Sequence, residues 1–147
     1  MSESLLTGYR FLEHTADAGV EIDAPSPTEI YRLGLFALTD CLTVLKKIEP
    51  RERHPFSLRA GGLDLLLVDW LQELLFRFET TGFVARDTEL RLTSEDEGEF
   101  VLEGVLLGEP FDPARHPVRL PVKAVTYHQL VFEPTDHGYF ARVIFDV

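Results

Sequence analysis

The segment that most restricts the fold is a long apolar stretch from about Leu63 to about Thr80, which follows two glycines and ends before Gly82. Glycine is common just past the end of a helix, so these limits predict a helix. Apolar residues cover most of its circumference, which predicts a helix buried more deeply than an ordinary surface helix. Within its most apolar part, Leu65 to Phe78, four polar residues exclude a bilayer span: Asp69, Gln72, Glu73 and Arg77.

A second helix is predicted earlier in the chain. Ser26 fits its N-cap, Pro27 its first position and Glu29 the reciprocal position of a capping box. Apolar residues then recur at helical spacing, and this face should pack against a sheet. The residues of that face are Ile30, Leu33, Ala37, Cys41, Leu42 and Leu45.

Strand-like segments fill most of the remaining chain. Two of them, Tyr9–His14 and Val20–Asp23, precede the first helix, and His54–Ala60 lies between the helices. From Phe83 onward the apolar residues alternate, and four further strand-like segments follow, at residues 88–94, 99–107, 122–132 and 139–147. The short sequences DEGE and DHG between them are typical of hairpin turns.

This order of elements, β-β-α-β-α-β-β-β-β, predicts a single α+β domain over residues 1–147. We expect a two-layer sandwich in which two helices pack on one face of a largely antiparallel, or mixed, β-sheet. A chain of this length is large enough to bury a hydrophobic core of its own.

The charge balance limits the kind of partner. With 25 acidic residues against 14 Lys and Arg, the formal net charge is −11. A protein that binds nucleic acid through its own surface needs basic residues to neutralise the phosphates. The composition therefore argues against nucleic-acid binding and favours a cation or a basic protein as the partner.

The cysteine content and the N-terminal sequence limit the compartment. A single cysteine excludes an internal disulfide, and no Cys/His cluster indicates a zinc site. No signal peptide is recognisable, so we expect a cytoplasmic protein.

Two groups of polar residues near the helices could carry chemistry or could be structural. Glu13, His14 and Asp17 fall where a strand gives way to a turn. An aspartate there is commonly a backbone cap, and a histidine is commonly a hydrogen-bonded structural residue. Asp69 and Glu73 are one turn apart on one helix face and could share a cation. The alternative is a solvated stripe, which an arginine at the next i+4 position supports.

A third group lies in a proline-rich stretch and the strand that follows it: Glu109, Asp112, His116, Lys123 and His128. Lys123 lies among strand-like apolar residues, so its ammonium group must reach solvent or meet an acid. This position fits a lysine with a functional role. It fits equally a lysine whose charge keeps a solvated edge strand from pairing with another chain.

The fourth candidate is Asp146, which stands between Phe145 and Val147 in the apolar run ARVIFDV. A carboxylate buried in a strand needs a cation, a basic side chain or backbone N–H groups as its partner. With Asp17 and main-chain carbonyls it would form a hard oxygen site, which suits calcium or magnesium better than zinc. If the first and last strands are neighbours, the two aspartates converge at one edge of the sheet.

Signatures of a catalytic site are missing from the sequence. It contains none of the motifs GxSxG, HExxH and GxxxxGK[ST], and Cys41 lies on the apolar face of a predicted helix. A nucleophile with a positioned base cannot be assembled from these residues. We therefore expect a protein with no catalytic activity of its own.

Four motifs, HTADAG, LLLVDWLQELL, VKAVTYH and a C-terminal VIFDV, occur in this order over nearly the whole chain. Together they resemble the archease family of small acidic proteins. Archeases assist the RNA-splicing ligase, which joins 3′-phosphate or 2′,3′-cyclic phosphate ends to 5′-hydroxyl ends. The resemblance implies a metal-binding activator in tRNA splicing and RNA repair. Such an activator promotes GTP-dependent guanylylation of the ligase's active-site histidine and allows repeated turnover.

The resemblance also implies site residues. The acids of the first and last motifs, Asp17 and Asp146, match the family's metal ligands, and Val147 adds a carbonyl or carboxylate oxygen. The implied cofactor is a divalent metal, calcium or else magnesium or manganese. Lys123 matches the family's functionally important lysine. We assign the partner surface further to three residues of the same motifs: His14, Glu73 and His128.

The expected partner is the RNA-splicing ligase, with no direct nucleic-acid binding and no membrane contact. Two other functions remain open: a metal-dependent phosphoesterase or nuclease, and a chaperone-like binding module. The first needs more carboxylates around the metal, basic groups for phosphate and often a second metal. A metal with open positions beside a basic, phosphate-sized pocket would favour it.

Overall fold

The computed structural model describes residues 7–13 and 18–147. Two helices, α1 (Pro27–Leu42) and α2 (Leu63–Thr81), are accompanied by short 3-10 turns, η1 (Leu45–Lys47) and η2 (Asp96–Gly98). The strands are β1 (Gly8–Glu13), β2 (Ala18–Ala24), β3 (Glu52–Ala60), β4 (Phe83–Ser94), β5 (Phe100–Pro110), β6 (Ala124–Val125), β7 (Val131–Thr135) and β8 (Gly138–Asp146).

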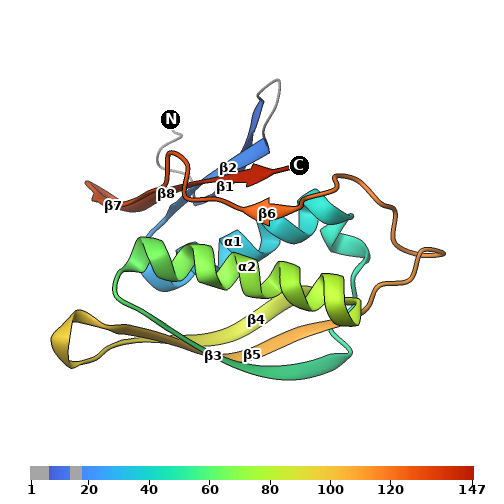
Figure 1. Ribbon diagram of the computed structural model, residues 1–147, viewed down its shortest axis with the longest axis horizontal. Coiled ribbons are helices and arrows are strands. Elements are labelled where there is room, and N and C mark those ends of the chain that lie inside the picture. The colour runs from blue at the N-terminus through green and yellow to red at the C-terminus, as the bar shows by residue number, and fades with distance from the viewer. Residues whose placement is uncertain (1–6, 14–17) are drawn as a thin grey trace.

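The strands form two antiparallel sheets, and both helices lie between them (Figure 1). The larger sheet has the order β1-β2-β8-β6, with β7 also paired to β8, and the smaller has the order β3-β5-β4. Each helix contacts both sheets: α1 packs on β2 and β4, and α2 packs on β3 and β6. The predicted α+β class and antiparallel pairing are confirmed, but the strands are divided between two sheets instead of forming one.

The apolar circumference of α2 explains why a second sheet is needed. One sheet covers only one side of a helix, so a helix that is apolar nearly all round requires cover on two sides. The indole N–H of Trp70 donates to the carbonyl of Tyr31 at 2.8 Å, which joins α2 to α1 in the middle layer. The buried residues of α2 are Leu66, Leu67, Val68, Trp70, Leu71, Leu74 and Leu75.

The start of α1 and the end of α2 follow the predicted signals, but the reciprocal capping-box bond expected from the Glu29 side chain to the Ser26 N–H is not formed. The hydroxyl of Ser26 accepts a hydrogen bond from the N–H of Glu29 at 3.3 Å, and Pro27 is the first residue of α1. The Glu29 carboxylate lies 3.7 Å from the guanidinium of Arg32. Gly82 ends α2 in the left-handed conformation with φ 78°, and its N–H donates to the carbonyl of Phe78. This conformation favours glycine because other residues meet a Cβ clash there.

The strand predicted over residues 122–132 is wrong in extent. Only Ala124–Val125 pair with β8 as β6, and a turn then separates them from β7. In that turn Gln129 has φ 52°, a conformation that interrupts an extended chain. The hairpin turns at DEGE and DHG are confirmed, since they connect β4 to β5 and β7 to β8. Within the described part of the chain, no helix is both long and apolar enough to cross a membrane.

Candidate functional site

The end of β8 brings three distant segments of the chain together. On one side β2 pairs with β8, and the last pair of this register is Ala18 with Phe145. On the other side Ala124 of β6 pairs with Asp146, and the N–H of Lys123 donates to the carbonyl of Asp146 at 2.7 Å. Two of the predicted site residues, Lys123 directly before β6 and Asp146 at the end of β8, are therefore joined by a backbone hydrogen bond.

The environment of Asp146 differs from the prediction. The sequence predicts a buried carboxylate, but the structure shows Asp146 exposed beside the fully buried Phe145. Side chains alternate along a strand, so Phe145 and Asp146 point to opposite faces. Ile144 is on the same face as Asp146 and is buried, so the acid is exposed because it lies at the end of the strand. An exposed carboxylate does not need an internal partner for the fold to be stable, and it is accessible to an external cation.

Asp17 and His14 lie outside the described residues. Asp17 directly precedes Ala18 in the sequence, and Ala18 pairs with Phe145, which directly precedes Asp146. The neighbour of the last strand is therefore the second strand, β2, while the first strand, β1, occupies the sheet edge. The predicted convergence of the two aspartates thus depends on the β2–β8 register and not on a contact between the first and last strands.

The donor set at the end of β8 consists of hard oxygen atoms. Asp146 contributes an accessible carboxylate, and Val147, which is half-buried, contributes main-chain oxygen. Such donors fit calcium, magnesium or manganese better than zinc. Among residues 7–13 and 18–147, no group of three or more His, Cys, Asp or Glu could hold a metal ion. Of the three predicted metal ligands, the described residues thus include Asp146 and Val147, while Asp17 lies outside them.

Lys123 is exposed, and its backbone is fixed from two sides. Its N–H bonds to β8, and the next residue but one, Val125, donates its N–H to the side-chain oxygen of Gln72 on α2 at 3.2 Å. His128 follows in the turn after β6, where it is exposed and its N–H donates to the Thr126 hydroxyl. The predicted residues Lys123 and His128 therefore belong to one segment, anchored to both β8 and α2.

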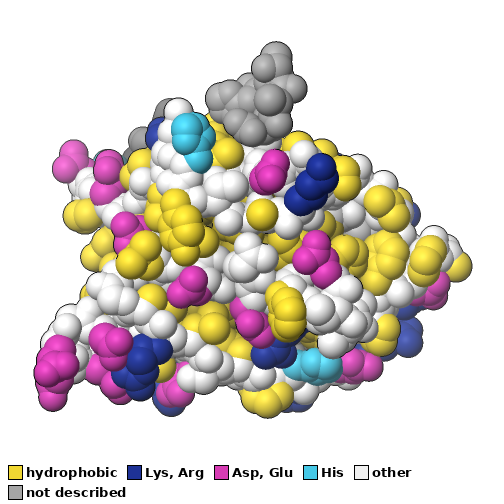
Figure 2. All heavy atoms as spheres, viewed as in Figure 1, with side chains coloured by type: hydrophobic (Ala, Val, Ile, Leu, Met, Phe, Trp, Pro, Cys, Tyr) yellow, Lys and Arg dark blue, Asp and Glu magenta, His cyan; other side chains and the backbone are white. Residues whose placement is uncertain are grey.

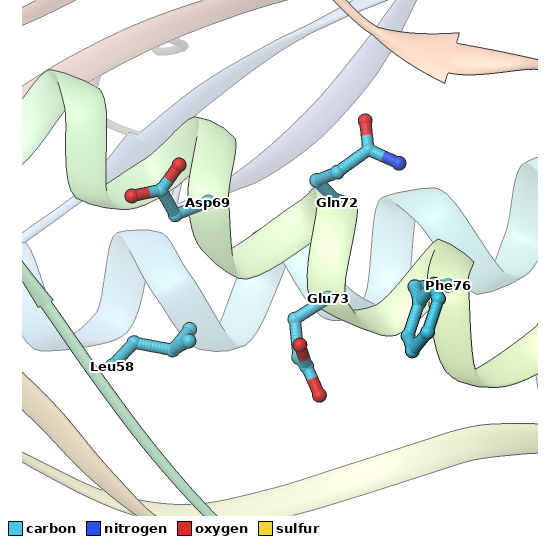
Figure 3. A pocket seen from close by; sticks show the side chains of 5 residues that line it. All are labelled: Leu58, Asp69, Gln72, Glu73 and Phe76. Atoms are coloured by element: carbon cyan, nitrogen blue, oxygen red, sulfur yellow. The ribbon is translucent and has the colours of Figure 1, made fainter.

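Glu73 lies elsewhere, in a groove between α2 and β3. Its carboxylate accepts a hydrogen bond from the guanidinium of Arg77 at 2.7 Å, the i+4 pair that the sequence indicates. Figure 3 shows Asp69 and Glu73 on successive turns of α2, with Leu58 on the facing strand. The structure thus separates Glu73 from the residues that gather at the end of β8.

A buried polar network accounts for the acids and the histidine of the proline-rich stretch. The Glu109 carboxylate accepts hydrogen bonds from Arg115 at 2.7 Å and from the N–H of Glu49 at 2.8 Å. His116 is fully buried, and its Nδ1 accepts the N–H of Asp112 at 2.8 Å. Its Nε2 must then carry the proton, which it donates to Glu109 at 3.0 Å.

This network is structural. The Arg115 guanidinium, followed by the other hydrogen bonds, lowers the pKa of Glu109 to about 2. A hydrogen bond from the N–H of Ala114 likewise lowers the pKa of Asp112. These bonds connect the end of β5, the loop after it and Glu49, which follows η1. The sequence identifies Glu109, Asp112 and His116 as candidate polar residues. It gives no sign of the contact between Glu109 and Glu49, because the two residues are 60 positions apart.

Cys41 has no features of a nucleophile. It is buried, and burial raises the pKa of its thiol to about 12. A thiol with such a pKa forms very little thiolate at neutral pH, and the thiolate is the reactive species. The residue is a small apolar part of the core, as its place on the inward face of α1 predicts.

The comparisons with known proteins agree on one family. The model of the Archease protein family matches residues 9–147. The archease of Methanopyrus kandleri is 39% identical over 136 residues, which are 92% of this chain and 96% of that protein. The archease of Methanosarcina mazei is 33% identical over 139 residues, or 95% of each chain.

Two solved structures share the fold. Protein 1598 of Methanobacterium thermoautotrophicum superposes with a TM-score of 0.78 at 28% identity, over 97% of this chain and 100% of that chain. The archease of Thermotoga maritima, described as a possible chaperone, superposes with a TM-score of 0.56 at 21% identity, over 92% of this chain and 94% of that chain. With the family model and the curated relatives in agreement, this chain belongs to the archease family.

Proposed function

We propose that this archease activates an RNA-splicing ligase by promoting GTP-dependent guanylylation of the ligase histidine and by allowing repeated turnover. The observation that carries the proposal is the accessible carboxylate of Asp146, with Lys123 bonded to the same residue through its backbone. An acid that can hold a cation and a mobile cationic side chain next to it suit contacts with the phosphates of a nucleotide held by a partner. A cytoplasmic location and a role in tRNA splicing and RNA repair belong to the same proposal.

Asp17, Asp146 and an oxygen of Val147 would hold one divalent cation in this proposal. Calcium is the first choice and magnesium or manganese the alternatives, because all donors are oxygen atoms. The pairing of Ala18 with Phe145 supports it, since each of these residues directly precedes one of the two aspartates. Calcium takes about six to eight oxygen ligands, so two carboxylates leave positions for main-chain carbonyls and water. When bound, the cation supplies positive charge that attracts phosphate or carboxylate oxygens of the partner.

The acidity of the chain supports a basic protein partner. A formal net charge of −11 attracts a ligase surface that binds RNA through basic groups, and it repels RNA itself. Such attraction acts mainly on the association rate and is screened by salt.

The proposal is tested by guanylylation of the ligase. In sub-stoichiometric amounts, the purified protein is expected to accelerate transfer of radiolabelled GMP from GTP to the ligase, with a smaller effect as salt is raised. Alone, it is expected to show no ligase, nuclease or phosphatase activity. Divalent-dependent turnover of RNA by the isolated protein would instead support the phosphoesterase function, and a full-length ligase that gains nothing from its addition would refute the activator.

Lys123→Ala is expected to lower the stimulated guanylylation rate about tenfold, or about 1.4 kcal/mol of activation free energy. Lys123 is exposed and its fold contact is made by the backbone N–H, so alanine keeps that bond and the stability of the protein. Lys47→Ala is the matched control, because Lys47 is equally exposed and lies in η1. Thermal unfolding of the Lys123→Ala variant decides the alternative: a large loss of stability would make the lysine a structural ion-pair residue.

A further inference from the structure

A groove of about 360 Å³ lies between α2 and β3, apart from the end of β8. Leu58 of β3 forms one wall, and Asp69, Gln72, Glu73 and Phe76 of α2 form the other (Figure 3). Figure 2 shows acidic and uncovered hydrophobic side chains next to one another over α2. The groove therefore combines an apolar floor with carboxylates at its rim.

The apolar part of the groove is unusually open. Phe76 is 56% exposed, while its neighbours Leu74 and Leu75 are buried. Complete burial of a phenylalanine side chain contributes roughly 1.5–3 kcal/mol, so covering the exposed part of Phe76, 56% of its surface, contributes about half as much. Phe76 and the half-buried Leu58 thus offer a binding surface for an apolar or aliphatic group.

The two carboxylates of the groove differ in their partners. Glu73 is paired with Arg77, which also donates to the carbonyl of Pro55. Asp69 has no ion pair among the described residues, and it is exposed, although the desolvation by its surroundings still raises the pKa of its carboxyl group. Desolvation that disfavours a carboxylate is relieved when a cation comes next to it. The Asp69 carboxylate at the rim of the groove is therefore suited to pair with a positively charged group.

We propose that this groove binds an arginine side chain presented by a flexible segment of a protein partner, with its stem on Phe76 and Leu58 and its guanidinium at Asp69. Arginine fits better than lysine, because its planar guanidinium pairs with a carboxylate through two N–H groups and is less strongly hydrated than an ammonium group. Phosphate groups of a nucleic acid would be repelled by these acids. A second copy of this chain, with its own net charge of −11, would be repelled as well. The groove thus provides a partner contact that does not depend on the ligase or on a metal.

The binding of a short peptide to the full chain tests this inference. The peptide contains one arginine flanked by leucines, and its control contains citrulline, which has the same shape without the charge. In a nitrogen-15 NMR titration, the arginine peptide is expected to shift the signals of Leu58, Asp69, Gln72 and Phe76. Its affinity should fall with salt, and the citrulline peptide should bind about two- to fivefold more weakly, as for one exposed ion pair.

Substitutions separate the groove from the general acidity of the chain. Asp69→Asn is expected to weaken arginine-peptide binding about two- to fivefold, and Phe76→Ser by about fivefold. Glu79→Gln is the matched control, because Glu79 is exposed on the same helix outside the groove and its substitution removes the same charge. Equal weakening by Glu79→Gln, equal affinity of the two peptides, or shifts that map away from the groove would each overturn the inference.

Discussion

Asp146→Asn is expected to weaken divalent-cation binding about 100-fold or more and to abolish activation of the ligase. The amide keeps the shape of the side chain but removes the negative charge and one of its two strong acceptor oxygens, and hard cations depend on both. Asp17→Asn should have the same effect, because the proposed site needs two carboxylates. Calorimetric titration with calcium measures the affinity, and the guanylylation assay measures the function.

The fold of the Asp146→Asn variant should be unchanged. Asp146 is exposed, and its contact with Lys123 uses the backbone carbonyl, which the substitution leaves in place. Asp136→Asn is the matched control: Asp136 is exposed in the turn before β8 and its substitution changes the charge by the same amount. Calcium affinity equal to that of the unsubstituted protein in the Asp146→Asn variant would remove this aspartate from the cation site. Equal losses in the Asp136→Asn variant would show that total charge, and not the site, governs binding.

The helices could be predicted from the sequence because their signals are local. The cap at Ser26, Pro27 and the glycine after α2 act within one turn, and the structure confirms them. The division of the strands into two sheets is not local. It depends on which strands meet after folding, and alternation of apolar residues shows only that one face of each strand is buried. The apolar residues over most of the circumference of α2 were the one sequence feature that indicated burial on more than one side.

The residues of the candidate site could be predicted from the sequence, but the environment of their side chains could not. Sequence patterns single out Lys123 and Asp146, and in the structure the residue directly before β6 bonds to the last residue of β8. The exposure of Asp146 was mispredicted because its apolar neighbours in sequence indicate a buried strand, whereas the acid lies at the end of that strand. The short extent of β6 escaped prediction because the turn at Gln129 lacks glycine.

Gln72 connects the two surfaces of the molecule discussed above. Its side-chain oxygen accepts the N–H of Val125 on β6, and the same side chain lines the groove between α2 and β3. The backbone of β6 in turn bonds to the end of β8, beside Asp146. A partner segment in the groove would therefore lie against the same helix that anchors the Lys123 segment.

Glu109→Gln is expected to destabilise the protein by on the order of 2–3 kcal/mol at neutral pH. Glu109 is 1% exposed, and its carboxylate accepts hydrogen bonds from Arg115, His116 and the N–H of Glu49. An amide removes the charge that Arg115 faces and presents its own N–H groups to these donors, which leaves buried groups unsatisfied. Glu109→Ala, which removes every acceptor, is expected to cost about 3–5 kcal/mol. Denaturant unfolding measures both.

The pH dependence of this effect follows from the lowered pKa of Glu109. Its ordinary pKa is 4.5, and Arg115 with the other hydrogen bonds lowers it to about 2 in the folded protein. The unfolded chain therefore binds the proton more readily, so the stabilisation is complete above about pH 4.5 and is lost as the pH falls towards 2. The difference in unfolding free energy between the unsubstituted protein and the Glu109→Gln variant should shrink over this range.

Glu103→Gln is the control on the same strand. Glu103 also pairs with an arginine but is partly exposed, so its substitution should lower the unfolding free energy by less than about 1 kcal/mol. A difference for Glu109→Gln that stays constant down to pH 2 would mean that the carboxylate acts through shape and packing, not through charge.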